Sequence, residues 1–319
     1  MQIMVSVLCA AYNQEKYIEK TLQGFVMQKT DFAWEALIND DASTDGTRRI
    51  IERFAEKYPN IIKPVYHKEN QFSQGISIIR DNLIPKAKGK YFAFCEGDDF
   101  WTDPNKLQKQ VDYMEAHPEC TLCIHNSSRV KKDGEPAGMT TVSDHDRDFS
   151  PDEVIMGGGG FCMTNSIMAP GKLMRNVPDY FNIRICDYTW QIYLASKGTT
   201  HCIARNMSAY RISSEGSLTV AISRMPPEEQ IELNRRTEQM LQAFDQETDK
   251  QYHKAVMSRQ GCYRIKNIFL SEDNADYDRE KCRLAKKFFS RKDYANAKLI
   301  IFSPKLYQRL KKLYHKIKK

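Results

Sequence analysis

The stretch that decides the fold is ALINDDASTDGT, residues 36–47. It opens with three apolar residues, as expected of a short strand covered on both faces, and runs directly into a polar segment that ends in Asp45-Gly46-Thr47. Residues 47–58 then show helical periodicity, and Pro59 closes them. A short buried strand, a polar loop and a helix form the repeating unit of a parallel α/β sheet.

The same unit recurs on both sides of this stretch. Further short apolar strands are expected at 5–9, 61–67 and 91–95, and helices at 14–28 and 75–87. The alternation predicts an α/β fold with a doubly wound, mostly parallel sheet covered by helices on both faces. Ligands of such sheets bind beyond the carboxyl ends of the strands, so the residues that follow each strand are the functional candidates.

The second half of the chain is organised differently. The pair Pro226-Pro227 is the clearest break, and the sequence beyond it is helical and strongly charged. We therefore expect a catalytic or binding domain over residues 1–225 and a helical, basic C-terminal extension over residues 226–319.

Composition narrows the class of protein. The 319 residues are 28% charged and 41% hydrophobic, which excludes the disordered, collagen-like and disulfide-scaffold classes. No stretch approaches the ~18 apolar residues that would span a bilayer. The N-terminus lacks the basic region of a signal peptide. Nine scattered cysteines, an odd number, favour reduced and buried thiols, so we expect a cytoplasmic protein.

Polar clusters follow three of the expected strands, at residues 10–13, 40–47 and 96–99. Acidic groups that meet at one sheet edge repel one another unless a cation neutralises them, and a hard divalent ion with phosphate oxygens is the natural solution. Glu96-x-Asp98-Asp99, directly after five apolar residues, is thus a candidate metal–diphosphate site. Asp and Asn also favour loop starts and helix N-caps, and we assign residues 43–45 to that structural role.

The order and spacing of these segments resemble the inverting family 2 glycosyltransferases, which have a GT-A fold. The resemblance rests on VSVLCAAYNQEKYIEKTL (5–22), EALINDDASTDGT (35–47) and AKGKYFAFCEGDD (87–99), and it covers about residues 3–220. One motif alone would be weak, but three in order are specific.

The sequence departs from the family pattern at two visible places. Ala10-Ala11 replaces Pro-Thr, and Glu96 replaces the first Asp of the acidic motif. Asp98 and Asp99 remain, so neither change removes a group that the chemistry must have.

The resemblance implies a nucleotide-sugar donor, a UDP-sugar by this pattern. Tyr12 would stack on the base beside the backbone of Ala10, and Asp41 would accept a hydrogen bond from the uracil imide. A fixed carboxylate selects a base because an analogue without that N–H leaves the charge unpaired. Arg80 would lie near the nucleotide, although a solvated helix arginine is an equally good interpretation.

The resemblance also assigns the acidic turn. Asp98 would hold the ribose or assist the cation, and Asp99 would bind the Mg²⁺ or Mn²⁺ that bridges the two phosphates. The cation stabilises the leaving nucleoside diphosphate. The family's Tyr-Arg-x-His motif ends here in Ser213, which leaves a third protein ligand open.

An inverting transfer needs a base that takes the proton of the acceptor hydroxyl. The family places it in an acidic motif before a helix, and the matching stretch here is CDYTWQIYLASKG, residues 186–198. The resemblance makes Asp187 the base, with Cys186 in place of the usual Glu. Capping of the helix by Asp187 remains open and is compatible with that role. The glycines at 157–160 lie where the family's acceptor loop enters the site. They form either a flexible loop that closes over the acceptor pocket or an ordinary loop.

The C-terminal tail carries most of the positive charge. Residues 281–319 hold 14 Lys and Arg against one acid, a local charge of +13 that leaves −6 on the rest of the chain. Within 305–319, Leu306, Leu310 and Leu313 share one helical face among seven basic residues. Such a helix suits an anionic membrane surface, and a packed or solvated basic helix is the open alternative. No nucleic-acid-binding motif accompanies the charge, so we expect no nucleic-acid partner.

These observations together predict a metal-dependent, inverting, non-processive glycosyltransferase. The processive signature Gln-x-x-Arg-Trp is absent. The resemblance implies a saccharide or polyprenyl-linked acceptor in polysaccharide or glycolipid assembly, at the inner face of the cell membrane. Two alternatives remain: a nucleotide-sugar-binding protein without catalysis, and a nucleotidyltransferase on a related fold. The latter needs a Gly-rich triphosphate loop after the first strand, where this chain has residues 10–13, AAYN.

Overall fold

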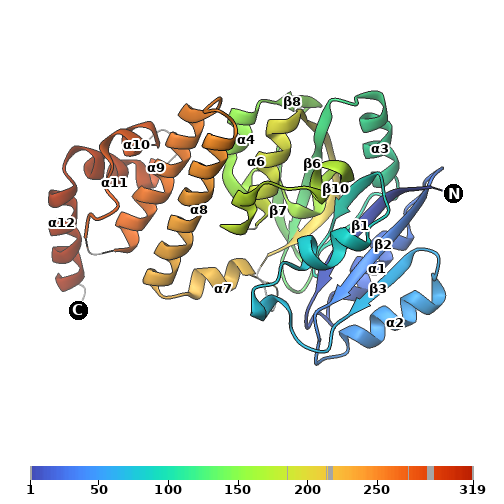
Figure 1. The fold of residues 1–319 in the computed structure, drawn as a ribbon. Helices are drawn as coiled ribbons and strands as arrows, with labels where there is room; N and C mark the ends of the chain where they lie inside the picture. The colour runs from blue at the N-terminus through green and yellow to red at the C-terminus, as the bar shows by residue number, and fades with distance from the viewer. Residues whose placement is uncertain are drawn as a thin grey trace. The chain divides into compact units, whose positions relative to one another are not determined.

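The computed structural model describes residues 2–184, 186–212, 214, 218–271, 273–285 and 291–317. The chain forms two compact units (Figure 1). The first contains Met1–Ser150, Gly159–Pro178 and Trp190–Val220, and the second contains Pro151–Gly158, Asp179–Thr189 and Ala221–Lys319. The last junction lies near the boundary expected at 225/226, but two short segments between 151 and 189 join the helical unit instead of the first.

A mixed sheet forms the centre of the first unit. The order of its strands is β3-β2-β1-β4-β9-β6-β10-β5, with β7 beside β6 and β8 beside β10. The strand bounds are β1 Ile3–Ala11, β2 Ala33–Asp40, β3 Ile62–Tyr66, β4 Tyr91–Phe94, β5 Phe100–Trp101, β6 Cys120–Val130, β7 Pro136–Thr140, β8 Arg147–Phe149, β9 Met168–Pro170 and β10 Thr199–Arg211.

The first four strands run parallel to one another, as the sequence predicts, and β6 is parallel to β10. Strand β9 lies antiparallel between β4 and β6 and joins the two parallel groups. Strands β1 and β2 are buried along nearly their whole length, which is typical of strands covered on both faces. The expected α/β sheet is confirmed.

Helices cover the sheet and build the second unit. Their bounds are α1 Ile18–Val26, α2 Thr47–Lys57, α3 Lys106–Ala116, α4 Pro151–Gly157, α5 Gly171–Arg175, α6 Asp187–Lys197, α7 Leu218–Arg224, α8 Pro227–Glu247, α9 His253–Leu270, α10 Arg279–Ala285, α11 Arg291–Phe302 and α12 Pro304–Ile317. Pro227 is the first helical residue of α8, the position where proline is best tolerated. The helical C-terminal region is therefore confirmed.

The segment expected as one helix at 75–87 is different. It folds as a π-helical turn, Ile78–Leu83, followed by a 3₁₀ turn, Ile84–Lys86. Pro85 contributes to the break, because proline has no N–H to donate to an intrahelical hydrogen bond.

Each unit has its own apolar core. In the first it surrounds β1, β2 and β4, and in the second it joins α9, α10, α11 and α12 through residues such as Ile265, Cys282 and Ile300. All nine cysteines are free thiols, and all but the half-buried Cys186 are buried, as expected. Within the described residues, no helix combines the length and apolar character that a membrane span requires.

Candidate active site

Three polar segments meet at the carboxyl ends of β1, β2 and β4. The ladder continues past the strands on both sides of β1: the N–H of Asp41 donates to the carbonyl of Ala11 over 3.0 Å, and that of Gly97 donates to the carbonyl of Ala10 over 2.9 Å. Asp41 and the acidic turn Glu96–Asp99 therefore flank the end of β1. The structure brings these predicted segments together.

The loop after β1, residues 12–15, is tied to the loop after β2, residues 43–47. Backbone N–H groups of each loop donate to side chains of the other. The bonds are Asn13 to Ser43, Gln14 to Thr47, Glu15 to Asp45, Thr44 to Asn13 and Gly46 to Glu15, all between 2.7 and 3.0 Å. Burial alone would raise the pKa of Asp45, but hydrogen bonds from Thr47 and Glu15 lower it. The structural role expected for residues 43–45 is therefore present, and it extends to the neighbouring loop.

The two predicted base contacts at the end of β1 lie in different environments. Tyr12 is 43% exposed, so its ring is available for stacking. Ala10 is half-buried within β1, with its carbonyl already accepting the Gly97 N–H. Asn13 follows with φ +51°, in the left-handed region that asparagine tolerates.

Asp41 is buried and holds a loop of its own. Oδ1 accepts the N–H of Gln71 over 2.7 Å, and Oδ2 accepts the N–H of Phe72 over 3.0 Å. Asn70 donates to the Asp41 carbonyl over 3.3 Å. Each carboxylate oxygen has a further lone pair, so these bonds are compatible with a ligand N–H. The residue after it, Ala42, has φ +62°, in the left-handed region that favours glycine.

Arg80 lies in the π-helical turn and is half-buried. Its Nε lies 2.6 Å from Oδ1 of Asp81 and its Nη2 lies 3.2 Å from Oδ2 of the same carboxylate. This two-point ion pair lies between neighbours in the chain. The nucleotide contact of Arg80 stays a prediction.

Asp98 and Asp99 differ sharply in environment. Asp99 is fully buried, with Oδ2 accepting from Nδ2 of Asn165 over 2.9 Å and Oδ1 accepting the N–H of Arg211 over 2.7 Å. Asp98 is half-buried, and its Oδ2 accepts from Oγ of Ser214 over 2.5 Å. Each oxygen of Asp99 thus already accepts one bond from the protein, whereas Asp98 lies nearer the surface. The metal-binding role of Asp99 stays a prediction.

The acidic turn is electrostatically strained. Burial raises the pKa of Asp99 well above its usual range, and the charges on Asp98 and Glu96 raise it further. Burial also raises the pKa of Asp98, against the hydrogen bond from Ser214. The Arg211 guanidinium opposes both shifts, but it donates to carbonyl oxygens, those of Asp98 and of residues 131 and 132.

A divalent cation fits this turn. Glu96 is exposed and Asp98 half-buried, so carboxylate oxygens lie at its surface. Among the described residues, no group of three His, Cys, Asp or Glu side chains forms a metal cluster. Mg²⁺ usually needs only one or two carboxylates when substrate phosphates complete its shell. The donor set agrees with a cation bound together with a diphosphate.

Asp187 belongs to the second unit, whereas Asp41, Asp98 and Asp99 belong to the first. It is the first residue of α6 and is half-buried. A carboxylate in a first turn is stabilised by the helix dipole, so the capping interpretation is chemically sound. Ser213, which replaces the family's histidine, lies outside the described residues.

The family is shown by comparison with known proteins. The sequence model described as "Glycosyl transferase family 2" matches residues 6–169, about half of the chain. The chain belongs to this family. Several of its relatives are named as glycosyltransferases.

Relatives of this family 2 chain include proteins of polysaccharide assembly. It is 36% identical to an uncharacterized protein of Mycobacterium tuberculosis over 216 residues, 66% of this chain and 60% of that one. It is 37% identical to the putative teichuronic acid biosynthesis glycosyltransferase TuaG of Bacillus subtilis over 42% of this chain and 50% of TuaG. A third relative is the Escherichia coli UDP-Glc:alpha-D-GlcNAc-diphosphoundecaprenol beta-1,3-glucosyltransferase WfgD, 30% identical over 35% of this chain and 41% of WfgD. The matches span 60% or less of these relatives' lengths.

Solved structures show the GT-A fold. TarS 1–349 of Staphylococcus aureus, solved in complex with UDP-GlcNAc, has a TM-score of 0.64 at 15% identity, over 98% of this chain and 92% of that chain. The mannosyltransferase PcManGT of Pyrobaculum calidifontis, solved with GDP-Man and Mn²⁺, has a TM-score of 0.54 at 17% identity, over 97% and 83%. The expected GT-A fold is confirmed.

Sequence reasoning missed the residues that hold the acidic turn. Asn165 and Arg211 bind Asp99, and Oγ1 of Thr21 donates to the carbonyls of Gly97 and Asp99 over 2.9 and 2.6 Å. Arg211 belongs to the motif that ends in Ser213, but Asp99 lies 112 residues away from it in the sequence. A buried polar residue is a usable signal only once its neighbours are known.

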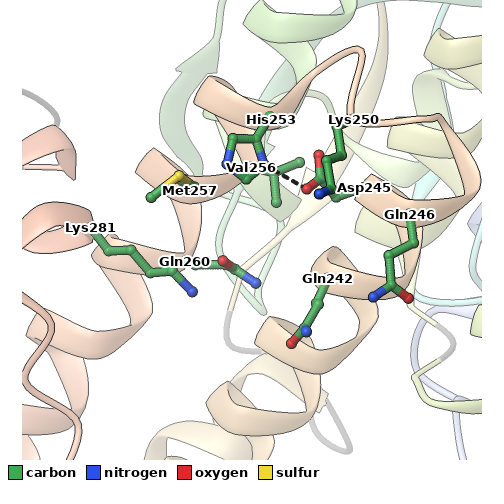
Figure 2. Close-up of a pocket in the computed structure, with 9 residues that line it drawn as sticks. All are labelled: Gln242, Asp245, Gln246, Lys250, His253, Val256, Met257, Gln260 and Lys281. Atoms are coloured by element: carbon green, nitrogen blue, oxygen red, sulfur yellow. Dashed lines mark hydrogen bonds and ion pairs between the residues drawn. The ribbon is translucent and has the colours of Figure 1, made fainter.

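A pocket of about 300 Å³ lies in the helical unit, away from the predicted site residues in sequence (Figure 2). It is lined by Gln242, Asp245, Gln246, Lys250, His253, Val256, Met257, Gln260 and Lys281. Nδ1 of His253 lies 2.7 Å from Oδ2 of the buried Asp245, and this pair joins α8 to α9. None of the predicted donor, metal or base residues lines this pocket.

Proposed function

We propose that the chain is a metal-dependent, inverting and non-processive glycosyltransferase. It moves one sugar from a UDP-sugar to a saccharide or lipid-linked saccharide in polysaccharide or glycolipid assembly. The observation that carries the proposal is the convergence of Asp41 and the charge-strained turn Glu96–Asp99 around the end of β1. The UDP-GlcNAc complex of TarS and the names of TuaG and WfgD support the donor and acceptor classes.

In this proposal the donor lies over the ends of β1 and β2. The exposed ring of Tyr12 stacks on the base beside the backbone of Ala10, and Asp41 accepts its imide N–H. The bonds from residues 71 and 72 hold the Asp41 carboxylate in one orientation, which favours base selection. Arg80 would contact the nucleotide beside its ion pair with Asp81, because a guanidinium has more N–H donors than this pair uses.

Asp98, assisted by Glu96, would hold Mg²⁺ or Mn²⁺, and Asp99 would position the turn. When bound, the cation supplies Lewis-acid stabilisation to the departing nucleoside diphosphate. The protein's part is to keep these carboxylates close despite their repulsion, through the bonds from Ser214, Asn165 and Arg211. The Mn²⁺ in the PcManGT complex supports a divalent ion in this fold.

Asp187 is proposed as the base that takes the acceptor hydroxyl's proton while that oxygen attacks the anomeric carbon. A general base of this kind contributes about 10²–10⁴-fold to the rate. Its place in the first turn of α6 favours the ionised form, which is the form a base requires.

A panel of nucleotide sugars with Mn²⁺ tests the proposal on the wild type and on Asp187→Asn. We expect one donor to bind both proteins, and the variant to lose at least about 100-fold in turnover. Asp179→Asn is a matched control, since Asp179 is an exposed carboxylate eight residues upstream. Equal turnover by Asp187→Asn and the wild type would remove Asp187 from the mechanism. Binding of a nucleotide sugar without any hydrolysis or transfer by the wild type would favour the non-catalytic alternative.

We also propose that α12 attaches the chain to an anionic membrane surface, on the cytoplasmic side. One face of the helix is fixed to α9: Nε2 of Gln308 donates to the carbonyl of Ile268, and Nζ of Lys311 donates to those of Phe269 and Ser271. The other face exposes Leu306, Leu310 and Leu313 by 45–55%, beside the exposed cations Lys305 and Arg309. Apolar side chains flanked by cations complement anionic lipid headgroups.

Co-sedimentation with vesicles tests this attachment. We expect binding to vesicles with about 30% phosphatidylglycerol, weakened by salt and by Leu310→Ser with Leu313→Ser. Met139→Ser is the control, an exposed apolar residue on β7. Equal binding by the double variant would exclude α12 as the attachment site.

A further inference from the structure

Among the described residues of the second unit, three cations that lie near Tyr188 or Tyr263 or shortly before Asp187 make no ion pair. Arg184 precedes Asp187 by three residues, and Arg259 and Lys266 lie on α9. Within the described part of the chain, no carboxylate pairs with any of the three. Other arginines of the same unit are paired, Arg264 with Glu238 and Asp278 and Arg235 with Asp276. The unit therefore leaves a specific subset of its cations without counter-charge.

Arg259 is held in position by aromatic rings and by one carbonyl. Its guanidinium lies 5.7 Å from the centre of the Tyr188 ring and 5.1 Å from that of Tyr263, and Nη1 donates to the carbonyl of Met156 over 3.4 Å. Its Nε is buried and has no acceptor. Tyr188 is itself fixed, since its hydroxyl donates to the carbonyl of Ile155 over 2.7 Å.

Gly158 makes room for this guanidinium. It has φ +66°, and a Cβ at this position would collide with Nη2 and Cζ of Arg259. A Cβ at Gly160, two residues on, would meet nothing within 4 Å. Of these two glycines, only Gly158 is required by the placement of Arg259.

Arg184 repeats the pattern. Nη1 donates to the carbonyl of Leu233 over 3.2 Å, whereas Nε is buried without an acceptor. Burial raises the pKa of the Tyr263 hydroxyl, while the charges of Arg259 and Arg184 both act to lower it, so all three groups lie within electrostatic reach. Nζ of Lys266 lies 5.6 Å from the Tyr263 ring centre. Burial lowers the pKa of Lys266, and the charge of Arg259 lowers it further.

Buried N–H donors without acceptors and like charges without counter-ions both raise the free energy of the folded chain. One anion relieves both costs. A diphosphate fits better than a carboxylate, because it carries more charge and enough oxygens for several donors, and guanidinium groups bind phosphate oxygens in pairs. The cations flank the segment that carries Asp187, so the anion belongs to the molecule on the acceptor side.

We propose that Arg184, Arg259 and Lys266 bind the diphosphate of a lipid-linked acceptor. This inference rests on the proposed function for the identity of the acceptor, but the binding itself requires no sugar transfer. The site selects acceptors whose first sugar is attached to a diphosphate, and it positions that sugar relative to Asp187.

Calorimetric titration of the full chain tests the site, with geranyl diphosphate and inorganic pyrophosphate as probes. The buffer contains no divalent metal and contains saturating UDP, which blocks the donor site. We expect the wild type to bind both probes, and Arg184→Gln and Arg259→Gln each to weaken binding by about tenfold or more. Lys266→Gln, at an exposed position, should fold normally and weaken it several-fold. Lys254→Gln, an exposed lysine on the same helix, is the matched control.

Gly158→Ala separates the position of Arg259 from its charge. We expect it to weaken binding although every cation remains, and Gly160→Ala to leave binding unchanged. Equal binding by the wild type and Lys266→Gln, Arg184→Gln and Arg259→Gln would overturn the site, as would the absence of probe binding to the wild type in this UDP-containing buffer. Binding of pyrophosphate without geranyl diphosphate would overturn the lipid-linked acceptor. If the site binds the probe as expected and no nucleotide sugar is turned over, the proposed function fails and the site stands.

Discussion

Asn165 donates from Nδ2 to Oδ2 of Asp99 over 2.9 Å, across 66 residues of sequence. Asn165 is fully buried, and its own Oδ1 accepts from Oγ of Ser208 over 2.8 Å. The second oxygen of Asp99 accepts the N–H of Arg211. Asp99 therefore joins the acidic turn to β10 and to the segment before β9.

Substitution of Asp99 should mainly lower the stability of the fold, and substitution of Asp98 should mainly lower metal-stimulated turnover. Asp99→Asn places an amide N–H₂ against a donor, so we expect a loss of about 1–3 kcal/mol in the free energy of unfolding. Asp98→Asn should change that free energy by less than about 1 kcal/mol but lower metal-stimulated turnover by at least about 100-fold. Urea unfolding and a Mn²⁺ titration of activity measure the two effects. A stable Asp99→Asn protein with abolished Mn²⁺ response would return the metal role to Asp99.

Asp41 should contribute to stability as well as to donor binding. Its carboxylate accepts two backbone N–H groups, from Gln71 and Phe72, which Asp41→Ala leaves without acceptors. We expect a loss of about 1–3 kcal/mol by urea unfolding, together with weaker UDP binding. Asp41→Asn retains one acceptor and should lose less stability. If Asp41→Ala unfolds like the wild type, the bonds to the 71–72 loop contribute little.

Ala42 is a site for stabilisation. Its φ of +62° strains a residue with a Cβ by roughly 1–2 kcal/mol in the folded state. Glycine removes this strain, but its greater conformational entropy in the unfolded chain offsets part of the gain in stability. We expect Ala42→Gly to raise the free energy of unfolding by about 0.5–1 kcal/mol. Ala55→Gly, within α2, should lower it by about the same amount, because the helix there needs no left-handed residue. The same sign for both variants would contradict this explanation.

Lys106 should make stability depend on pH. It is fully buried, bound to Oε1 of Gln110 over 2.7 Å, and burial lowers its pKa to about 7, against smaller opposing effects of Cys95 and Cys123. In the unfolded chain its pKa is near 10.5, so the unfolded state binds more protons between about pH 7 and 10.5. The contribution of Lys106 to stability therefore rises with pH through this window, by at most about 1.4 kcal/mol per unit.

Lys106→Met removes this titration. The difference in free energy of unfolding between wild type and variant, measured in urea at pH 7, 8 and 9, should increase in favour of the wild type as the pH rises. Taking the difference cancels the titration of the thiols and tyrosines that both proteins share. A constant difference across the three pH values would show that burial does not lower the pKa of Lys106.

The sequence predicted the alternation of strands and helices because burial on both faces leaves uninterrupted apolar runs, as in β1, β2 and β4. It did not predict the π-helical turn at Ile78–Leu83, since Pro85 was read within a continuous helical period. The sequence also did not predict that β9 lies antiparallel between β4 and β6. A three-residue strand has too little pattern to indicate its direction.

The site was predictable where motif residues follow a strand directly, as Asp41 and Asp98 do. It was not predictable where a role depends on partners distant in sequence. Burial and the bonds from Asn165 and Arg211 distinguish Asp99 from Asp98, and neither is visible in the run Glu96–Asp99. The cations Arg184 and Arg259 carried no motif and were found only through their buried Nε atoms.

The reciprocal bonds between residues 12–15 and 43–47 have a consequence for engineering and for evolution. Each segment supplies the acceptors for the other's main-chain donors. Replacing only one segment with that of a relative would therefore leave polar groups of both segments without hydrogen-bond partners. Chimeras intended to change nucleotide preference should exchange the two as a cassette, and sequence drift in one should be accompanied by compensating drift in its partner.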